Sequence, residues 1–251
     1  MSFKVVIPAR YASVRLPGKP LLEIAGRPMI EWVMRAASKS GADEVLIATD
    51  DARIAERVGS RAVMTSAAHQ SGTDRIAEVA RQRSWDERTI VVNVQGDEPQ
   101  LPPALIDEVA TLLERHPDAD LATLCTPFAS LREFLDPNAV KVVMRDDASA
   151  LYFSRAPIPF ARDSAVEGLA SQSSFRGAHR HLGLYAYRVS ALARLSELPP
   201  SELESIEKLE QLRALQAGMK IVLSVVTSPP PAGIDTPDDL ERVRTALAAA
   251  G

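Results

Sequence analysis

The sequence predicts an α/β fold with a mostly parallel sheet that is flanked by helices on both faces. Short apolar, β-branched runs alternate with amphipathic stretches along most of the chain, and repeated strand–helix–strand units of this kind form parallel sheets. The 251 residues, 46% of them hydrophobic, suffice for one large domain or for one domain with an inserted lobe. We therefore predict a single domain over residues 1–251.

The predicted elements follow one another in a regular order. The strands are Phe3–Pro8, Glu44–Thr49, Arg61–Met64, Thr89–Val94, Ala119–Thr126 and Lys220–Val226. The helices are Pro28–Ser40, Asp51–Gly59, Thr73–Arg83, Pro102–Arg115, Leu203–Gln216 and Thr236–Ala249. Pro28 suits the first turn of its helix, where a missing N–H costs nothing, and Gly41 suits the exit. Ligands of such sheets bind beyond the carboxyl ends of the strands, so we expect the loops that follow the strands to converge.

In residues 140–188 the alternation of predicted strands and helices is interrupted. Valine-rich and aromatic runs alternate there with turn residues, which indicates antiparallel strands. The stretch Phe160–Ala178 is polar and small, as is typical of an exposed loop. We interpret residues 140–188 as an inserted lobe that recognises an acceptor substrate and contributes an interface.

Composition excludes several classes of protein. Lys and Arg total 29 against 33 Asp and Glu, and a net charge of −4 argues against a general nucleic-acid binder. Cys125 is the single cysteine, so no internal disulfide can form, and a buried apolar role is expected for it. The four histidines contain no H-x-x-x-H pair, which argues against zinc. The apolar N-terminal stretch is cut by Pro8 and no run of about 18 apolar residues exists, so we expect a soluble cytoplasmic protein.

The loop after the first strand concentrates positive charge. Arg10, Arg15 and Lys19 follow Pro8, and no carboxylate appears before Glu23. Arginine supplies directed forks and lysine a point charge, a combination that suits a polyphosphate. The spacing is neither G-x-x-x-x-G-K-[ST] nor G-x-G-x-x-G. A solvated basic loop is the alternative, but the position directly after the first strand favours a phosphate site.

A second apolar strand ends in Gln95-Gly96-Asp97-Glu98-Pro99. Gly96 lets the backbone turn sharply and approach a ligand. Asp97 lies at the carboxyl end of this strand, where a hard divalent cation would bridge carboxylate and phosphate oxygens. A simple turn carboxylate is the alternative for Asp97. Glu98 is expected to point the other way and to cap a helix or pair with a basic residue.

Two predicted helix starts carry more polar residues than capping requires. Thr73 or Asp74 can cap the helix that follows, while Ser71 and Gly72 offer backbone groups that could read the edge of a base. Asp235 precedes a Thr-Pro helix start, so capping does not explain it. We regard it as a candidate second carboxylate for a metal ion.

Three later segments place polar side chains beside apolar ones. They contain Arg155, His181 with Tyr185, and Glu210 with Gln211. A charged helix face is normally just solvated, and the pattern alone favours that interpretation for Glu210 and Gln211.

Taken together, seven segments carry a family resemblance along nearly the whole chain. In order, they read IPARYASVRLPGKPL, HQSGTDR, VNVQGDEP, YFSRAPIP, HRHLGLYAYR, LEQLRALQAGMKI and GIDTPDDL. In this order they resemble the 3-deoxy-manno-octulosonate cytidylyltransferases, also called CMP-Kdo synthetases. The resemblance implies a Rossmann-like nucleotidyltransferase fold, usually a homodimer, with residues 140–188 as acceptor-binding and dimerisation lobe. It implies that CTP and Kdo react with Mg²⁺ to give CMP-Kdo and pyrophosphate, which activates Kdo for lipopolysaccharide assembly.

The resemblance also implies roles for individual residues. The triphosphate would be held by Arg10, Arg15 and Lys19. The cytidine would be surrounded by Ala9, Ser71, Arg75 and Gln95. The sugar acid would be bound by Arg155, His181, Tyr185, Glu210 and Gln211. Asp97 and Asp235 would hold Mg²⁺, and with Arg10 and Lys19 they form the predicted catalytic set.

Two alternatives remain open at this stage. The first is a cytidylyltransferase of the same fold that acts on sialic acid or on an amino-substituted Kdo, and the acceptor lobe decides between these substrates. The second is a nucleotide-binding module without catalysis, against which the presence of both Asp97 and Asp235 speaks. The role of residues 162–176 is not assigned by the pattern.

Overall fold

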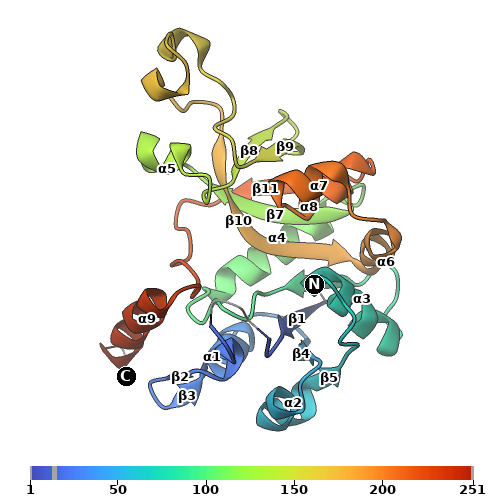
Figure 1. The fold of residues 1–251 in the computed structure, drawn as a ribbon. Helices are drawn as coiled ribbons and strands as arrows, with labels where there is room; N and C mark the ends of the chain where they lie inside the picture. The colour runs from blue at the N-terminus through green and yellow to red at the C-terminus, as the bar shows by residue number, and fades with distance from the viewer. Residues whose placement is uncertain (1, 13–15, 250–251) are drawn as a thin grey trace.

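A single large sheet organises the computed structural model, which describes residues 2–12 and 16–249 (Figure 1). Over the described residues the sheet has nine strands, with the path β11-β7-β10-β6-β1-β4-β5, and β8 and β9 attached beside β10. These strands are β1 (Phe3–Ala9), β4 (Glu44–Thr49), β5 (Ala62–Met64), β6 (Ile90–Asn93), β7 (Leu121–Thr126), β8 (Lys141–Met144), β9 (Ala150–Ser154), β10 (His179–Arg188) and β11 (Ile221–Val225). A small hairpin of β2 (Glu23–Ile24) and β3 (Arg27–Pro28) stands apart.

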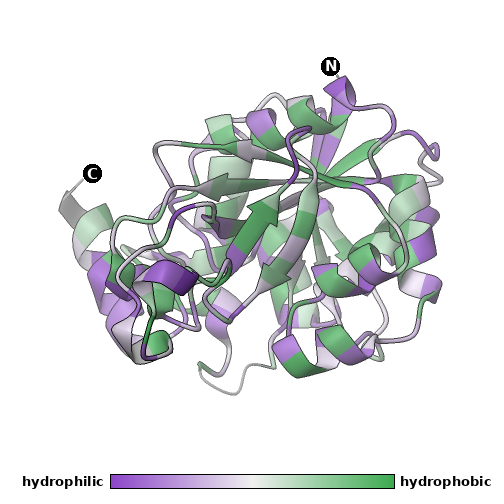
Figure 2. Ribbon diagram, turned by 90° about the horizontal axis from the view of Figure 1, so that it is seen from above, coloured by the Kyte–Doolittle hydropathy of each residue, from purple (hydrophilic) through white to green (hydrophobic). Residues whose placement is uncertain are grey.

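Helices cover both faces of this sheet. They are α1 (Met29–Ala37), α2 (Ala52–Val58), α3 (Gly72–Gln82), α4 (Pro103–Arg115), α5 (Leu131–Leu135), α6 (Val189–Glu197), α7 (Glu202–Glu207), α8 (Gln211–Gln216) and α9 (Pro237–Ala249). Side chains alternate across β1: Val5 and Ile7 pack with α1, α2 and α4, whereas Val6 packs with α3, α6 and α8. Figure 2 shows apolar residues in the central strands and more hydrophilic ones in the surrounding helices and loops.

The predicted parallel arrangement is confirmed on both sides of the sheet. β1 pairs in parallel with β4 and β6, β4 with β5, and β7 with β11. Every residue of β6 and β7 is buried, as expected for strands that helices cover on both faces. The carboxyl ends of β1, β4 and β6 therefore lie at one edge, and the loops that follow them meet there.

The segment 140–188 contains the antiparallel strands that the sequence predicts, but only part of it lies outside the central sheet. β8 and β9 form a hairpin, and β8 pairs with the start of β10 at His179 and Arg180. β10 pairs with β7 from Arg180 to Tyr187, and its second half, from Tyr185 to Arg188, also pairs with β6, antiparallel to both strands. Its residues from Leu184 to Tyr187 are buried, which is why this half belongs to the core. The chain between β9 and β10 projects away from the sheet (Figure 1).

One predicted helix is divided in two. The expected helix Leu203–Gln216 is interrupted at Lys208, whose φ of 53° places it in the left-handed region. The break lets the Glu207 carboxylate accept hydrogen bonds from Ser154 Oγ and from the Arg155 amide. The sequence did not predict α5 and α6. Among the described residues, no helix is both long and apolar enough to cross a bilayer.

Candidate active site

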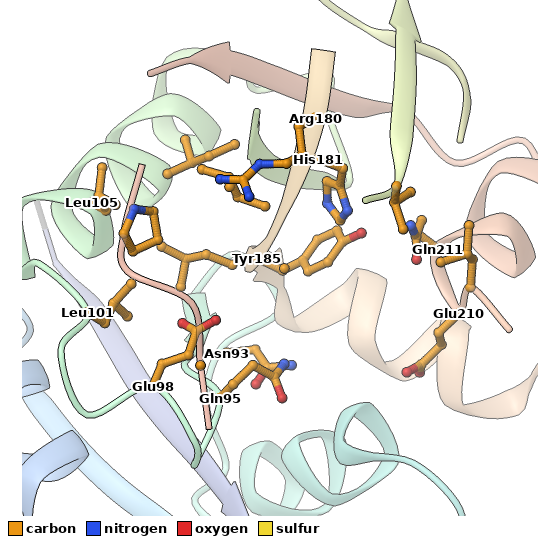
Figure 3. Close-up of a pocket in the computed structure, with 18 of the residues that line it drawn as sticks. Asn93, Gln95, Glu98, Leu101, Leu105, Arg180, His181, Tyr185, Glu210 and Gln211 are labelled. Atoms are coloured by element: carbon orange, nitrogen blue, oxygen red, sulfur yellow. The ribbon is translucent and has the colours of Figure 1, made fainter. Parts of the chain in front are cut away.

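A cavity of about 540 Å³ opens beyond the carboxyl end of β6. Its wall combines residues from β6 and the loop after it, from β10, from α8 and from the chain before α9 (Figure 3). Six of the residues to which the sequence analysis assigned a role in ligand or metal binding line it: Gln95, His181, Tyr185, Glu210, Gln211 and Asp235. Loops that are far apart in sequence thus meet where the parallel sheet predicts a ligand site.

Asp97 and Asp235 are brought together at the rim of this cavity. The Ile234 amide donates to the Asp97 carbonyl at 3.0 Å, which joins the chain before α9 to the loop after β6. A Cβ atom at Gly96 would stand 3.0 Å from the Pro8 carbonyl oxygen, a tight contact, so glycine favours the close approach of this loop to β1. Two carboxylates therefore share one edge of the sheet.

Lys19 lies between the two carboxylates. Its ammonium is 2.6 Å from Asp97 Oδ2 and 3.3 Å from Asp235 Oδ1. The Lys19 side chain is largely buried, whereas Asp97 and Asp235 are one-third and about one-half exposed. The prediction that the basic loop and the two carboxylates converge is thus confirmed for Lys19.

The donor set suits Mg²⁺ that arrives with a polyphosphate. In the described part of the chain no cluster of three or more His, Cys, Asp or Glu could hold a metal by itself. Mg²⁺ typically takes one or two protein carboxylates and completes its shell with phosphate oxygens and water. Asp97 and Asp235, with the basic loop beside them, meet that requirement.

The other basic residues of the first loop have different surroundings. The Arg10 guanidinium donates to the His69 carbonyl at 2.7 Å, and His69 in turn pairs with Glu78. Arg10 is thereby tied to the loop before α3. Arg15 lies outside the described residues.

The residues assigned to cytidine are only partly at the cavity. Gln95 lines it, and Ala9 is buried at the end of β1. Ser71 caps α3: its Oγ accepts from the Asp74 amide, and the Asp74 carboxylate accepts from the Ser71 amide. Arg75 is fully buried and donates to Asp50 and to Thr65 Oγ1.

At the other end of the cavity, β10 supplies uncharged polar groups. His181 Nε2 is 3.0 Å from Thr123 Oγ1, and its ring packs edge-on against Phe153. Burial lowers the pKa of His181 to about 3, so the imidazole is neutral at ordinary pH. The Tyr185 hydroxyl and Asn93 Oδ1 are buried without a partner in hydrogen-bonding geometry among the described groups. Buried polar atoms of this kind suit a hydroxyl-rich ligand.

α8 and the loop before it close this end. Burial raises the pKa of the Glu210 carboxyl, against the lowering effect of the Thr73 hydroxyl and of Arg213. Glu210 and Gln211 both line the cavity (Figure 3). Gln211 is buried, so the interpretation of a solvated helix face is wrong for it, whereas the Glu210 side chain is about one-third exposed. Thr73, which the sequence analysis considered only as a cap, also lines the cavity.

Two further residues differ from the sequence-based expectation. Glu98 lines the cavity instead of pointing away, and burial together with the Asp97 charge raises its pKa to about 7. Arg155 is not among the lining residues. Its guanidinium donates to the carbonyls of Glu207 and Pro137, neither of which lines the cavity.

We expect His181 to make folding pH-dependent. Its pKa is about 3 in the folded chain and about 6.5 when unfolded, so between these values only the unfolded chain binds the proton. The neutral ring contributes fully to the free energy of unfolding above pH 6.5. This contribution decreases as the pH falls, and at pH 5 it is smaller by about 2 kcal/mol. Urea unfolding at pH 7.5 and 5 should show a smaller pH difference for His181→Gln than for the wild type. An equal difference would contradict the assignment.

A nucleotidyltransferase is the class of protein that this fold and site define. A model of the family described as cytidylyltransferase matches residues 4–221. The chain belongs to this family, and within it to the 3-deoxy-manno-octulosonate cytidylyltransferases, as the resemblance predicted.

Two relatives and one solved structure agree on this assignment, and a second solved structure shares the fold. The chain is 55% identical to the 3-deoxy-manno-octulosonate cytidylyltransferase of Thioalkalivibrio sulfidiphilus, with 99% of this chain and 100% of the relative covered. The enzyme of the same name from Nitrosococcus oceani is 54% identical over 98% of this chain and 97% of its own length. A solved structure of CMP:2-keto-3-deoxy-manno-octonic acid synthetase complexed with CTP is 41% identical, with a TM-score of 0.87 over 100% of this chain and 99% of that one. A cytidylyltransferase from Leptospira borgpetersenii, 16% identical with a TM-score of 0.61, shares the fold; 99% of this chain and 87% of that one are covered.

Proposed function

We propose that this protein transfers CMP from CTP to the anomeric hydroxyl of Kdo and releases pyrophosphate. The observation that carries the proposal is the division of the cavity. One end holds the carboxylate pair bridged by Lys19, and the other holds polar side chains from β10 and from the start of α8, most of them uncharged. The name of the relatives and the CTP complex of the related synthetase support these two substrates.

The side chains at the phosphate end act by positioning and charge. The sugar hydroxyl must attack the α-phosphorus in line while pyrophosphate leaves. Both substrates are anionic, and two unit charges about 4 Å apart repel by roughly 1 kcal/mol in water and more in a drier site. Lys19, Arg10 and Arg15 would hold the triphosphate and stabilise the charge that develops on the leaving pyrophosphate.

We further propose that Mg²⁺ is required and that Asp97 and Asp235 hold it. When bound, the ion would neutralise phosphate charge and lower the pKa of a coordinated hydroxyl. Lys19 keeps the two carboxylates paired when no phosphate is present, because its ammonium already bridges them. Its long, flexible stem allows the ammonium to turn toward a triphosphate.

The cellular setting is proposed on the same basis. The product would serve lipopolysaccharide biosynthesis in the cytoplasm. A homodimer is supported by the segment between β9 and β10, which exposes Phe160, Val166 and Leu169. Sedimentation of the purified protein measures its oligomeric state directly.

The activity is tested by pyrophosphate release from CTP in the presence of different sugar acids. We expect release to need both CTP and Kdo, to stop when EDTA removes Mg²⁺ and to return when Mg²⁺ is added in excess. An amino-substituted Kdo and a sialic acid serve as competing acceptors in the same assay. Preference for either would assign a different acceptor, and CTP binding without release under any combination would indicate a binding module instead.

A further inference from the structure

Arg180 is a cavity residue to which the family resemblance gave no role. Among the described residues that line the cavity, it is the one arginine or lysine; the other charged residues are Glu98, Glu210 and Asp235. Figure 3 shows its side chain at the cavity beside His181, at the end opposite to Glu98 and Gln95. A sugar acid brings a carboxylate into a cavity whose remaining charges would repel it.

The strand register places Arg180 on the acceptor side. Tyr185 of β10 pairs with Asn93, the last residue of β6, while Arg180 pairs with Thr126 of β7 and Lys141 of β8. At roughly 3.3 Å per residue, Arg180 lies on the order of 15 Å along β10 beyond the carboxyl end of β6. Lys19 and its carboxylates lie at the other end, so a triphosphate held there leaves Arg180 to the second substrate.

The guanidinium retains donors for a ligand. One nitrogen, Nη1, pairs with Glu133 Oε1 at 3.2 Å and so fixes the side chain against α5. Nε is buried and has no hydrogen-bond acceptor among the described residues. The Nε edge of an arginine is the edge that pairs side-on with both oxygens of a carboxylate. A buried, unsatisfied donor on a cation costs free energy that such a ligand would recover.

We propose that Arg180 binds the carboxylate of the sugar acid and thereby selects acidic sugars as acceptors. The proposal deepens and rests on the proposed function of the cavity. It gives the anion-binding role to Arg180 in place of Arg155, whose guanidinium is engaged by backbone carbonyls outside the cavity. Glu133 positions the guanidinium through its other nitrogen, and the neutral His181 and Tyr185 are left to bind hydroxyl groups.

The test compares Kdo with its C1 carboxamide, which has the same shape but no charge. We expect the wild type to prefer the acid by about 30-fold or more in kcat/KM, the magnitude of a hydrogen bond to a charged group. In Arg180→Met, kcat/KM for Kdo should fall by a similar factor, and the preference for the acid should shrink to about threefold or less. Arg180→Lys, which keeps a point charge without the fork, should restore part of the preference. The KM for CTP should stay within about twofold.

Two matched variants separate ligand binding from a structural role. Glu133→Gln removes the ion pair but can still accept the hydrogen bond from the Ala129 amide. Arg188→Met removes an arginine of the same strand that donates to the carbonyls of Ala119 and Leu113. Arg188→Met should keep the wild-type preference for the acid over the amide, whatever it does to stability. Glu133→Gln, which loosens the positioning of the guanidinium but leaves Arg180 in place, should keep most of that preference.

The outcomes distinguish this proposal from the proposed function. If the wild type turns over Kdo and Arg180→Met discriminates acid from amide as the wild type does, Arg180 does not bind the carboxylate, although the enzyme is a Kdo cytidylyltransferase. If the wild type neither turns over Kdo nor binds it in calorimetry, both proposals fail. A loss of preference in Glu133→Gln as large as in Arg180→Met would reduce Arg180 to part of a structural ion pair.

Discussion

Asp97→Asn is expected to lower kcat by about 1,000-fold or more. Asparagine keeps the shape of the side chain but removes the charge that pairs with Lys19 and that would hold Mg²⁺. Stabilisation of phosphate charge by a metal ion is worth several kcal/mol, and about 4 kcal/mol corresponds to a factor of about 1,000 in rate. The rate of pyrophosphate release should be measured over a wide range of Mg²⁺ concentrations, because a weakened site shifts the concentration needed for half-maximal activity.

Asp238→Asn is the matched control for this experiment. Asp238 is an exposed carboxylate at the start of α9, three positions from Asp235, and it does not line the cavity. Its substitution should change kcat by about twofold or less, as expected for a surface site. Wild-type turnover by Asp97→Asn at ordinary Mg²⁺ concentrations would remove Asp97 from the metal site. A loss of equal size in Asp238→Asn would point to a general effect of charge.

The parallel half of the fold follows from local sequence pattern. β4 and β6 are short apolar runs between helical segments, so both their existence and their direction could be predicted. The parallel direction of β6 then places Asp97, which follows this strand, at the edge of the sheet where ligands bind. Asp235 is brought beside Asp97 by the hydrogen bond from the Ile234 amide to the Asp97 carbonyl. No local sequence pattern predicts this contact. Asp235 is nevertheless recognised as a candidate because helix capping does not explain its carboxylate.

The antiparallel part was harder to predict because its features depend on long-range pairing. β10 begins beside β8 and ends inside the core, and the change occurs at an irregularity in its pairing with β7 between Leu182 and Tyr185. The break at Lys208 accompanies the hydrogen bond from Ser154 to the Glu207 carboxylate, a contact between residues that are far apart in the sequence. The spacing of residues in the sequence does not distinguish Arg155 from Arg180. The Arg155 guanidinium donates hydrogen bonds to backbone carbonyls, whereas Arg180 lines the cavity.

Lys19→Met is expected to lower kcat on the order of 100-fold while leaving the KM for Kdo within about threefold. Loss of one preorganised donor to a developing charge typically costs a factor of this size. The KM for Kdo should be spared because Lys19 contacts Asp97 and Asp235, while Arg180, His181 and Tyr185 of β10 line the other end of the cavity. Steady-state kinetics with CTP and Kdo varied independently separate the two effects.

Lys4→Met is a matched control near the start of β1, at the opposite end of that strand from the loop that leads to Lys19. Lys4 pairs with Asp43 at 3.4 Å on the surface, and an exposed pair of this kind contributes little. It should leave kcat and both KM values unchanged. Lys19→Arg should recover part of the rate, because it restores the charge but not the point geometry that fits between two carboxylates. If Lys19→Met raised the KM for Kdo as much as it lowered kcat, the ammonium would act on both substrates and not on the leaving pyrophosphate alone.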